Sequence, residues 1–389
     1  MAIIIKESTK DSKGILIFTH KERKCLGEDV AFIAPLLKRL KERYVIGMHW
    51  GWYVPNAQHP PYVDFHLAFE DTVQFHGEVS PRRLRFNSSS FTPSYFSRRP
   101  EVPKQWDIIS VTRTAKFKNT DQLFHCLRLV FNQRPNTRAL VICVGPPGKP
   151  ATHHNELPEL YMRLFNREER EQFSFIYVRT KGLFPVSRRD IAYFYNSSRV
   201  FTLFSDTEGQ SKVIKEAMLC GLPVVAKAHL KGGGQQFFNS KNSRTFTTIE
   251  EGADCFIDLL NNYKQVEVDT EGLASETSET YTVPKFERAL RELFAELELP
   301  FEGKLYLDNL GQRLPSHVSS DVHDSLRTSQ TADVKNRASM LKFLRHLVQN
   351  RPIEQVQLNR VEQGLMQAQL YKEKVAYLGS AVLRRLALK

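Results

Sequence analysis

The stretch SDTEGQSKVIKEAMLCGLPVVA, residues 205–226, says most about the fold of this 389-residue chain. A helix-forming run covers residues 211–220 and is followed by Gly221, which suits the left-handed position that ends a helix. Pro223 cannot continue a helix, and the apolar residues 222–226 predict a short buried strand. A turn, a helix and a buried strand in this order form one unit of an α/β protein.

Two carboxylates stand eight positions apart in the same stretch. Glu208 lies in the turn with Gly209 directly after it, and Glu216 lies in the predicted helix. The N–H groups at the start of a helix are unpaired and favour a phosphate, and carboxylates on either side of it can bind hydroxyl groups. The arrangement therefore suits a sugar nucleotide. The alternative is that Glu216 is an ordinary surface carboxylate.

Residues 208–226 resemble the E-x7-E signature of family-4 retaining glycosyltransferases, whose usual form is close to EGFPLVLLEAMACGLPVVA. The match includes both glutamates, both glycines, the Glu-Ala-Met run and the Gly-Leu-Pro-Val-Val strand. The resemblance implies the GT-B fold, an α/β architecture in which two Rossmann-like lobes face a cleft. It also implies that a sugar is transferred from a nucleotide diphosphate with retention at the anomeric carbon.

The resemblance assigns roles to individual residues. Glu208 would contact the hydroxyls of the transferred sugar, and Glu216 would contact the ribose hydroxyls. Backbone N–H groups at the start of the helix would help to hold the diphosphate of the donor. These groups belong to Gly209, Gln210, Ser211 and Lys212.

Residues 109–118, ISVTRTAKFK, resemble the GRL…KG turn of the donor lobe in this family, with Thr112 where glycine is usual. Arg113 and Lys118 fall on the arginine and lysine of that turn. The resemblance assigns both to the leaving diphosphate, where negative charge builds as the glycosidic bond breaks. Without it, the two cations could simply be solvated loop residues.

Two further turns are similar but less complete. Residues 25–30, CLGEDV, resemble the turn that opens the first helix of the amino-terminal lobe, and the resemblance places Gly27 opposite the donor phosphates. Residues 231–238, KGGGQQFF, resemble a GG-x-x-E loop, but Gln235 and Gln236 stand where glutamate is common. The amino-terminal lobe of this family often supplies a histidine near the sugar. The best placed is His49, and no histidine is assigned a catalytic role.

Strands and helices alternate through most of the chain. In the amino-terminal part, strands are expected at 14–19, 44–48, 65–69 and 84–87, and a helix at 29–43. After a proline-rich linker at 91–104, strands are expected at 107–112, 139–144, 173–178, 200–204 and 222–226, and helices at 121–132, 157–171, 188–195, 211–220 and 249–262. Repeated βα units imply a parallel sheet with ligands at the carboxyl ends of its strands.

Four regions are expected along the chain. They are an acceptor-side lobe at 1–100, a donor-binding lobe at 101–265, a loop and helix region at 266–333 and a basic helical segment at 334–389. The first lobe is shorter than is usual in the family, which would leave the acceptor site small or open. Residues 266–283 are acidic and rich in Ser and Thr, and they indicate a surface loop.

Residues 334–389 carry eleven Lys and Arg against three Asp and Glu, with apolar positions at helical spacing. A basic amphipathic helix can lie on anionic lipid, which would give peripheral membrane contact and suit a lipid-linked acceptor. The alternative is that these extra carboxyl-terminal helices dock on the protein's own lobes, with their charges solvated.

The composition agrees with a nucleotide-binding protein. The formal net charge of +12 indicates an anionic partner, namely a nucleotide, a membrane surface or nucleic acid. No nucleic-acid-binding module is recognisable, so no nucleic-acid partner is expected. No apolar run reaches the ~20 residues that span a bilayer. Five scattered cysteines indicate reduced thiols and therefore a cytoplasmic protein. Its basic segment could hold the protein at the inner face of the membrane.

The combined prediction is a hexosyl-type glycosyltransferase that acts on a glycan or a lipid-linked acceptor, as in polysaccharide or glycolipid assembly. The nucleotide sugar is its donor substrate. The sequence has no Asp-x-Asp element, and neither a metal nor another cofactor is expected. The alternative is a non-catalytic GT-B subunit that binds a nucleotide or acts as a scaffold in glycan assembly. The short first lobe favours this alternative, and the intact signature opposes it.

Overall fold

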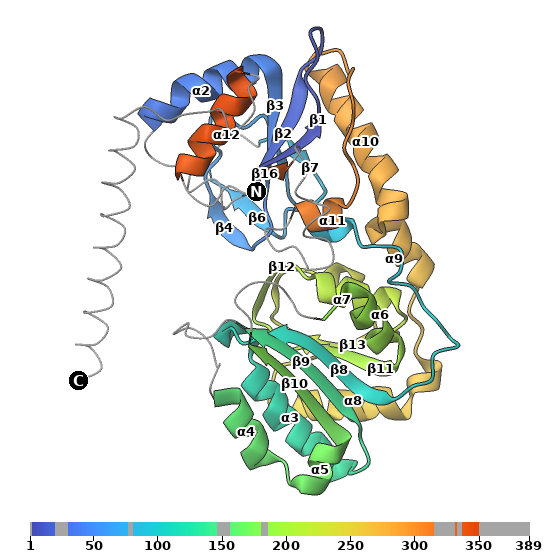
Figure 1. Cartoon of the computed structure of the whole chain (residues 1–389). Helices are drawn as coiled ribbons and strands as arrows, with labels where there is room; N and C mark the ends of the chain where they lie inside the picture. Colours follow the sequence, from blue (N-terminus) through green and yellow to red (C-terminus); the bar gives the residue numbers. More distant parts are fainter. Residues whose placement is uncertain are drawn as a thin grey trace, which may run out of the picture.

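The computed structural model describes residues 2–19, 30–76, 81–145, 156–179, 186–314, 331–332 and 337–349. These residues form two lobes, each built around a parallel or mostly parallel sheet (Figure 1). The expected α/β class is therefore confirmed.

The carboxyl-terminal lobe contains a six-stranded sheet of order β10-β9-β8-β11-β13-β15, in which all neighbouring strands are parallel. In chain order this is 3-2-1-4-5-6, the arrangement of a dinucleotide-binding Rossmann sheet, and its direction of winding reverses between β8 and β11. The strands are β8 (Trp106–Arg113), β9 (Ala139–Gly145), β10 (Phe173–Arg179), β11 (Ser198–Leu203), β13 (Val224–Lys227) and β15 (Ser243–Phe246).

Helices cover both faces of this sheet because successive side chains of a strand point to opposite faces. Ile108 packs into a core with α3, α4 and α8, whereas the adjacent Ile109 packs into a second core with α6 and α7. The helices are α3 (Thr120–Gln133), α4 (Glu156–Leu164), α5 (Arg167–Gln172), α6 (Arg188–Asn196), α7 (Lys212–Leu219) and α8 (Ile249–Asn261). The single helix expected at 157–171 is two helices, because Asn166 caps the start of α5.

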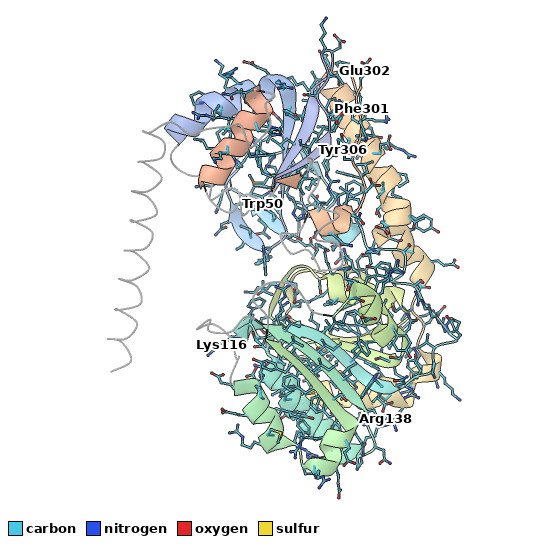
Figure 2. The ribbon with its side chains drawn as sticks, viewed as in Figure 1. Trp50, Lys116, Arg138, Phe301, Glu302 and Tyr306 are labelled. Carbon is cyan, nitrogen blue, oxygen red and sulfur yellow. The ribbon has the colours of Figure 1, made fainter. Side chains whose placement is uncertain are left out.

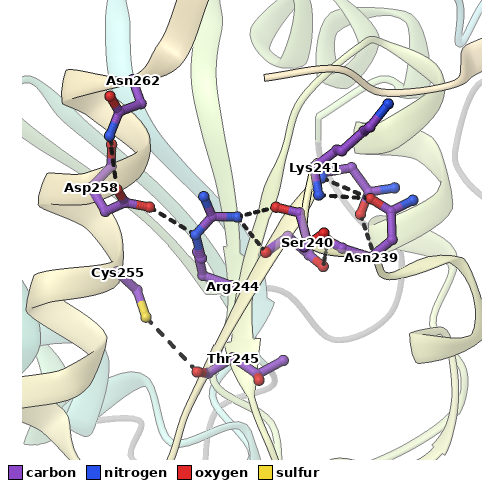
Figure 3. Close-up of polar contacts among 10 residues, drawn as sticks. Asn239, Ser240, Lys241, Arg244, Thr245, Cys255, Asp258 and Asn262 are labelled. Carbon is purple, nitrogen blue, oxygen red and sulfur yellow. Dashed lines mark hydrogen bonds and ion pairs between the residues drawn. The ribbon is translucent and has the colours of Figure 1, made fainter. Parts of the chain in front are cut away.

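Arg244 links the edge strand β15 to α8 through a salt bridge (Figure 3). Arg244 Nε lies 2.7 Å from Asp258 Oδ2, and its Nη1 donates to the carbonyl oxygens of Ser240 and Ser243 at 2.6 and 2.9 Å. Asp258 also accepts a 2.8 Å hydrogen bond from Asn262 Nδ2. These contacts fix the edge of the sheet, which the sequence did not predict to be a strand.

The amino-terminal lobe contains a sheet of order β16-β1-β2-β3-β5-β7. Strands β2, β3, β5 and β7 run parallel, whereas β1 is antiparallel to β2 and to β16. The elements are β1 (Ala2–Lys6), β2 (Gly14–Thr19), α2 (Val30–Arg43), β3 (Tyr44–His49), β5 (Phe65–Leu67), β7 (Arg83–Leu84) and β16 (Thr331–Ala332). A separate pair, β4 (Val54–Ala57) and β6 (Val73–Phe75), lies beside it.

The chain returns from the second lobe to the first through α9 (Thr270–Thr277) and α10 (Glu279–Glu296). Helix α10 runs along the amino-terminal sheet and buries Phe286 and Phe294 against Ile3 of β1 (Figure 1). The surface loop expected at 266–283 is therefore wrong, because Asp269 caps α9 and Leu273 and Thr277 give that polar helix its buried side.

The apolar face of helix α12 (Arg337–Gln349) is covered by the amino-terminal lobe. Leu341, Leu344 and Leu347 pack against Leu37 and Leu40 of α2, so this part of the basic segment docks on the amino-terminal lobe and its apolar face is not free to lie on lipid. The part of the basic segment beyond this helix, residues 350–389, lies outside the described residues. Among the described residues, no helix is both long enough and apolar enough to cross a membrane.

Candidate functional site

The carboxyl ends of the strands in the second lobe face the amino-terminal lobe. Lys116 follows β8 and lies at the edge nearest that lobe, whereas Arg138 precedes β9 and lies at the opposite edge (Figure 2). The reversal of winding between β8 and β11 occurs in the same sheet. Ligands of such sheets bind at the carboxyl ends of the strands, at the point of reversal.

Three of the predicted residues come together at this point. Glu208 lies on β12 (Thr207–Gln210), and its Oε1 forms an ion pair with Lys118 Nζ. Both side chains are largely buried, at 11% and 13% exposure. Arg113 is the exposed last residue of β8, where desolvation by the surrounding protein lowers its pKa and the nearby Glu208 carboxylate opposes that shift. One carboxylate is thus placed near two cations.

The turn that carries Lys118 is held by hydrogen bonds to the backbone of the residues that follow β11. Asp206 N donates to Phe117 O at 3.0 Å, and Asn119 Nδ2 donates to Phe204 O at 3.0 Å. Asn119 itself has a positive φ of 47°, a conformation that asparagine tolerates better than most residues. Strand β12 is fixed in turn by its parallel pairing with β14 (Lys231–Gly233).

Glu216 lies on α7 and forms a second ion pair, with Arg188 of α6. Arg188 Nη2 lies 2.7 Å from Glu216 Oε1, and Glu216 is 4% exposed. The alternative that Glu216 is an ordinary surface carboxylate is therefore wrong. Arg188 was not identified from the sequence, because an arginine at the start of a predicted helix gives no signal that distinguishes it from its neighbour Arg189.

Gln210, the last residue of β12, and Lys212, the first residue of α7, direct their side chains toward the amino-terminal lobe. Gln210 Nε2 donates to Asp71 Oδ1 at 3.0 Å and to Thr72 Oγ1 at 3.1 Å. Lys212 Nζ donates to a backbone carbonyl after α10, Gly311 O, at 2.5 Å. These two side chains therefore help to join the lobes.

Unlike Gln210 and Lys212, neither Gly209, which has no side chain, nor Ser211 joins the lobes through a side-chain hydrogen bond of its own among the described residues. A Cβ atom at Gly209 would lie 2.3 Å from Gly51 O of the amino-terminal lobe, so only glycine fits this close approach. Ser211 Oγ is buried, and within the described part of the chain it has no hydrogen-bond partner. Gly27 lies outside the described residues. Ser211 N donates to Gly233 O at 3.2 Å, so this N–H is not free to hold a phosphate as predicted. The phosphate-binding roles of the other four positions stay predictions.

The histidines of the amino-terminal lobe mostly serve its structure. His49 Nε2 accepts a 3.1 Å hydrogen bond from Ser88 N, next to Gly51. His66 is fully buried between Trp50 and His59, and burial lowers the pKa of His66 to about 3. Trp50 is also buried.

A buried lysine on α7 also spans the two lobes. Lys215 Nζ donates to Ser89 Oγ at 2.9 Å, and burial lowers the pKa of Lys215 to about 7. The unfolded chain keeps the ordinary lysine pKa of about 10.4. Between about pH 7 and pH 10 the unfolded state therefore binds more protons, and Lys215 makes stability rise with pH.

We expect Lys215→Met to remove this contribution. The free energy of unfolding of the variant, relative to that of the wild type, should fall by at least about 1 kcal/mol as the pH rises from 7 to 9. Urea unfolding across this range measures the difference. The control is Lys10→Met, at an exposed position between β1 and β2, whose relative stability should not change with pH over this range. A relative stability of Lys215→Met that is independent of pH would contradict the assignment.

Within the described ranges, no group of three or more His, Cys, Asp or Glu side chains could hold a metal ion. The independence from metals and other cofactors stays a prediction. Arg113 and Lys118 are the two cations placed near Glu208, and their predicted role in binding the phosphates of a ligand stays a prediction.

Comparisons with known proteins bear on the fold and on the second lobe. Residues 106–262 match the family model described as "Glycosyl transferases group 1". No curated protein matches the chain. Among solved structures, the pneumococcal O-GlcNAc transferase GtfA, solved with UDP and GlcNAc, aligns with a TM-score of 0.51 at 14% identity. The alignment covers 67% of this chain and 54% of GtfA.

Two further solved structures have similar folds. TarM aligns with a TM-score of 0.52 at 14% identity, over 72% of this chain and 54% of TarM. Anabaena Alr3699/HepE, solved with UDP, aligns with a TM-score of 0.50 at 13% identity, over 71% of this chain and 78% of its own. The chain thus spans about half the length of GtfA and TarM. It has the GT-B fold, and its second lobe matches glycosyl transferases group 1.

Proposed function

We propose that this protein is a retaining glycosyltransferase that takes a sugar from a nucleotide diphosphate and transfers it to a glycan or a lipid-linked acceptor. The observation that carries the proposal is the convergence of Glu208, Lys118 and Arg113 at the carboxyl edge of a Rossmann sheet, within the region that matches glycosyl transferases group 1. A carboxylate for sugar hydroxyls and two cations for a diphosphate are the groups that this reaction requires.

Each residue has a distinct task in the proposed reaction. Lys118 and Arg113 neutralise the diphosphate as the bond between it and the sugar breaks. In the free protein Glu208 is paired with Lys118. When the donor binds, Lys118 pairs with the diphosphate instead, and Glu208 can accept hydrogen bonds from hydroxyls of the transferred sugar. Glu216 accepts hydrogen bonds from the ribose hydroxyls.

The start of α7 supports the phosphates of the donor. The N–H groups of its first residues, and Ser211 Oγ, which is buried without a hydrogen-bond partner among the described residues, add neutral donors to the two cations. The Ser211 N–H is not one of these donors, because it donates to Gly233 O at 3.2 Å. Because Gln210 and Lys212 contact the amino-terminal lobe, the same segment brings the acceptor-side lobe against the donor. Retention at the anomeric carbon follows from the resemblance of the signature to family 4.

The proposal predicts selective stabilisation by one nucleotide. We expect a shift in melting temperature of the purified chain with UDP or GDP, and none with CMP or ADP. UDP is tested first because GtfA and Anabaena HepE were solved with it. A nucleotide at about 100 times its Kd adds about 2.7 kcal/mol to the stability of the folded state, which a melting curve detects.

The control for this screen is Glu216→Ala, whose shift at the same nucleotide concentration should be much smaller than that of the wild type. A melting temperature that no nucleotide changes would favour a non-catalytic scaffold subunit. A response that Glu216→Ala retains in full would place the nucleotide elsewhere in the molecule.

A further inference from the structure

We propose that Arg188 is a positioning residue that holds the Glu216 carboxylate in the orientation needed to bind the ribose of the donor. The inference rests on the proposed function, because it takes Glu216 to be the ribose ligand. Arg188 does not touch the reacting atoms in this scheme. It acts only through the carboxylate to which it is paired.

The ion pair is short and lies below the surface. Arg188 Nη2 lies 2.7 Å from Glu216 Oε1, and the two side chains are 21% and 5% exposed. A carboxylate so deeply buried would lose most of its hydration without a partner, and Arg188 supplies that partner. The pair also joins α6 to α7, the two helices on the same face of the sheet.

Arg188 is itself held in place by the linker between the lobes. Its guanidinium lies over the Phe96 ring, 5.1 Å from the centroid, and it forms a hydrogen bond with Tyr95. Burial alone would lower the pKa of Arg188, but the charge of Glu216 and the contact with Tyr95 outweigh it, and the pKa is raised. Arg188 is therefore a permanent cation with a fixed direction.

The remaining surroundings of Glu216 would not orient it in the same way. The hydroxyl of Tyr195, buried near Glu216, has no hydrogen-bond partner among the described residues. Lys212 is close enough for the charge of Glu216 to affect its pKa, but its ammonium donates to Gly311 O. Arg188 is thus the group whose direct contact fixes one oxygen of the Glu216 carboxylate.

The guanidinium also retains an unused donor. Arg188 Nε is buried, and it has no hydrogen-bond partner within the described part of the chain. A guanidinium placed only to neutralise a carboxylate could use a bidentate contact, which satisfies two of its N–H groups. Within the described part of the chain, Arg188 contacts Glu216 only from Nη2 to Oε1, so the guanidinium does not occupy Oε2, which can serve the two ribose hydroxyls.

The test measures how strongly the protein prefers a ribose with its hydroxyls. Calorimetric titration of the full chain with UDP and with 2′,3′-dideoxy-UDP, or with the guanosine pair if GDP is selected in the melting screen, gives a ratio of affinities. We expect the wild type to prefer the ribonucleotide by about 10- to 100-fold, the range for hydrogen bonds to a charged group. Arg188→Ala should reduce this ratio almost to that of Glu216→Ala.

Two further variants sharpen the test. Arg188→Lys keeps the charge without the planar guanidinium, so its ratio should lie between those of the wild type and Arg188→Ala. The double variant Glu216→Ala with Arg188→Ala should bind UDP as weakly as Glu216→Ala alone, because Arg188 acts only through that carboxylate. Arg189→Ala is the matched control, since Arg189 is exposed and contacts the ring of Tyr95 but no carboxylate of the site.

The outcomes separate this inference from the proposed function. If Glu216→Ala keeps the wild-type ratio, the ribose role of Glu216 is wrong. If Glu216→Ala loses the ratio while Arg188→Ala and Arg188→Lys both keep it, only the positioning role is overturned. If Arg188→Ala fails to fold, Arg188→Lys decides, and a ratio equal to that of the wild type overturns the inference.

Discussion

Glu208→Ala should lower the rate of sugar transfer by about 10²–10³-fold while nucleotide binding is retained. The rate falls because the carboxylate that contacts the transferred sugar is lost, and a single preorganised polar contact in a transition state contributes on this scale. Affinity for the nucleoside diphosphate should stay equal or become tighter, because Lys118 no longer has Glu208 as its partner and is free for the phosphates. Steady-state transfer assays and calorimetry of the same samples measure the two effects.

Two variants control this prediction. Glu208→Gln keeps the size of the side chain and one acceptor oxygen, and it should recover part of the lost rate. Asp206→Asn removes a nearby carboxylate that is 55% exposed and paired with Lys227, and it should transfer sugar at a rate close to that of the wild type. A Glu208→Ala enzyme that transfers sugar as fast as the wild type would overturn the assignment of Glu208.

The sequence predicts the donor lobe well because its signals are local. In β9, every residue from Ala139 to Gly145 is buried, and such an apolar run predicts a central parallel strand directly. The signature helix, expected at 211–220, is α7 at Lys212–Leu219. The site residues Glu208 and Lys118 stand ninety positions apart, and only the resemblance placed them in one site.

What the sequence did not predict depends on contacts between distant segments. Strands β12 and β14 are short and rich in glycine and polar residues, and each is a strand because it pairs with the other. Helix α9 is polar, and its burial depends on where the chain crosses back to the first lobe. Arg188 is a functional candidate only because folding brings it to Glu216.

The departures from the usual signature have a structural reason that the sequence alone did not reveal. Where the family form EGFPLVLLEAM has Phe, Leu and Leu, this chain has Gln210, Lys212 and Lys215. All three side chains donate hydrogen bonds toward segments packed at the junction of the lobes, namely Asp71 and Thr72, Gly311 and Ser89. At the junction of the lobes, this chain therefore has polar side chains where the family form has apolar ones, while both glutamates of the signature are kept.

Lys118→Ala is expected to reduce kcat/KM for the donor by about 10²–10³-fold, because the leaving diphosphate loses a cation in a largely buried position. Nucleotide affinity should fall as well, and more for the nucleoside diphosphate than for the monophosphate. This difference separates a contact with phosphate from a role in neutralising Glu208 alone. Calorimetry with UDP and UMP, or with GDP and GMP, measures it.

The matched control for this prediction lies two residues away. Lys116 belongs to the same short helical turn but is exposed, so Lys116→Ala should change kcat/KM by less than about 3-fold. If Lys118→Ala weakens the diphosphate and the monophosphate equally, Lys118 serves mainly to neutralise Glu208. In that case Arg113, whose pKa also responds to Glu208, would be the principal cation for the leaving group. The loss in Arg113→Ala should then exceed the loss in Lys118→Ala.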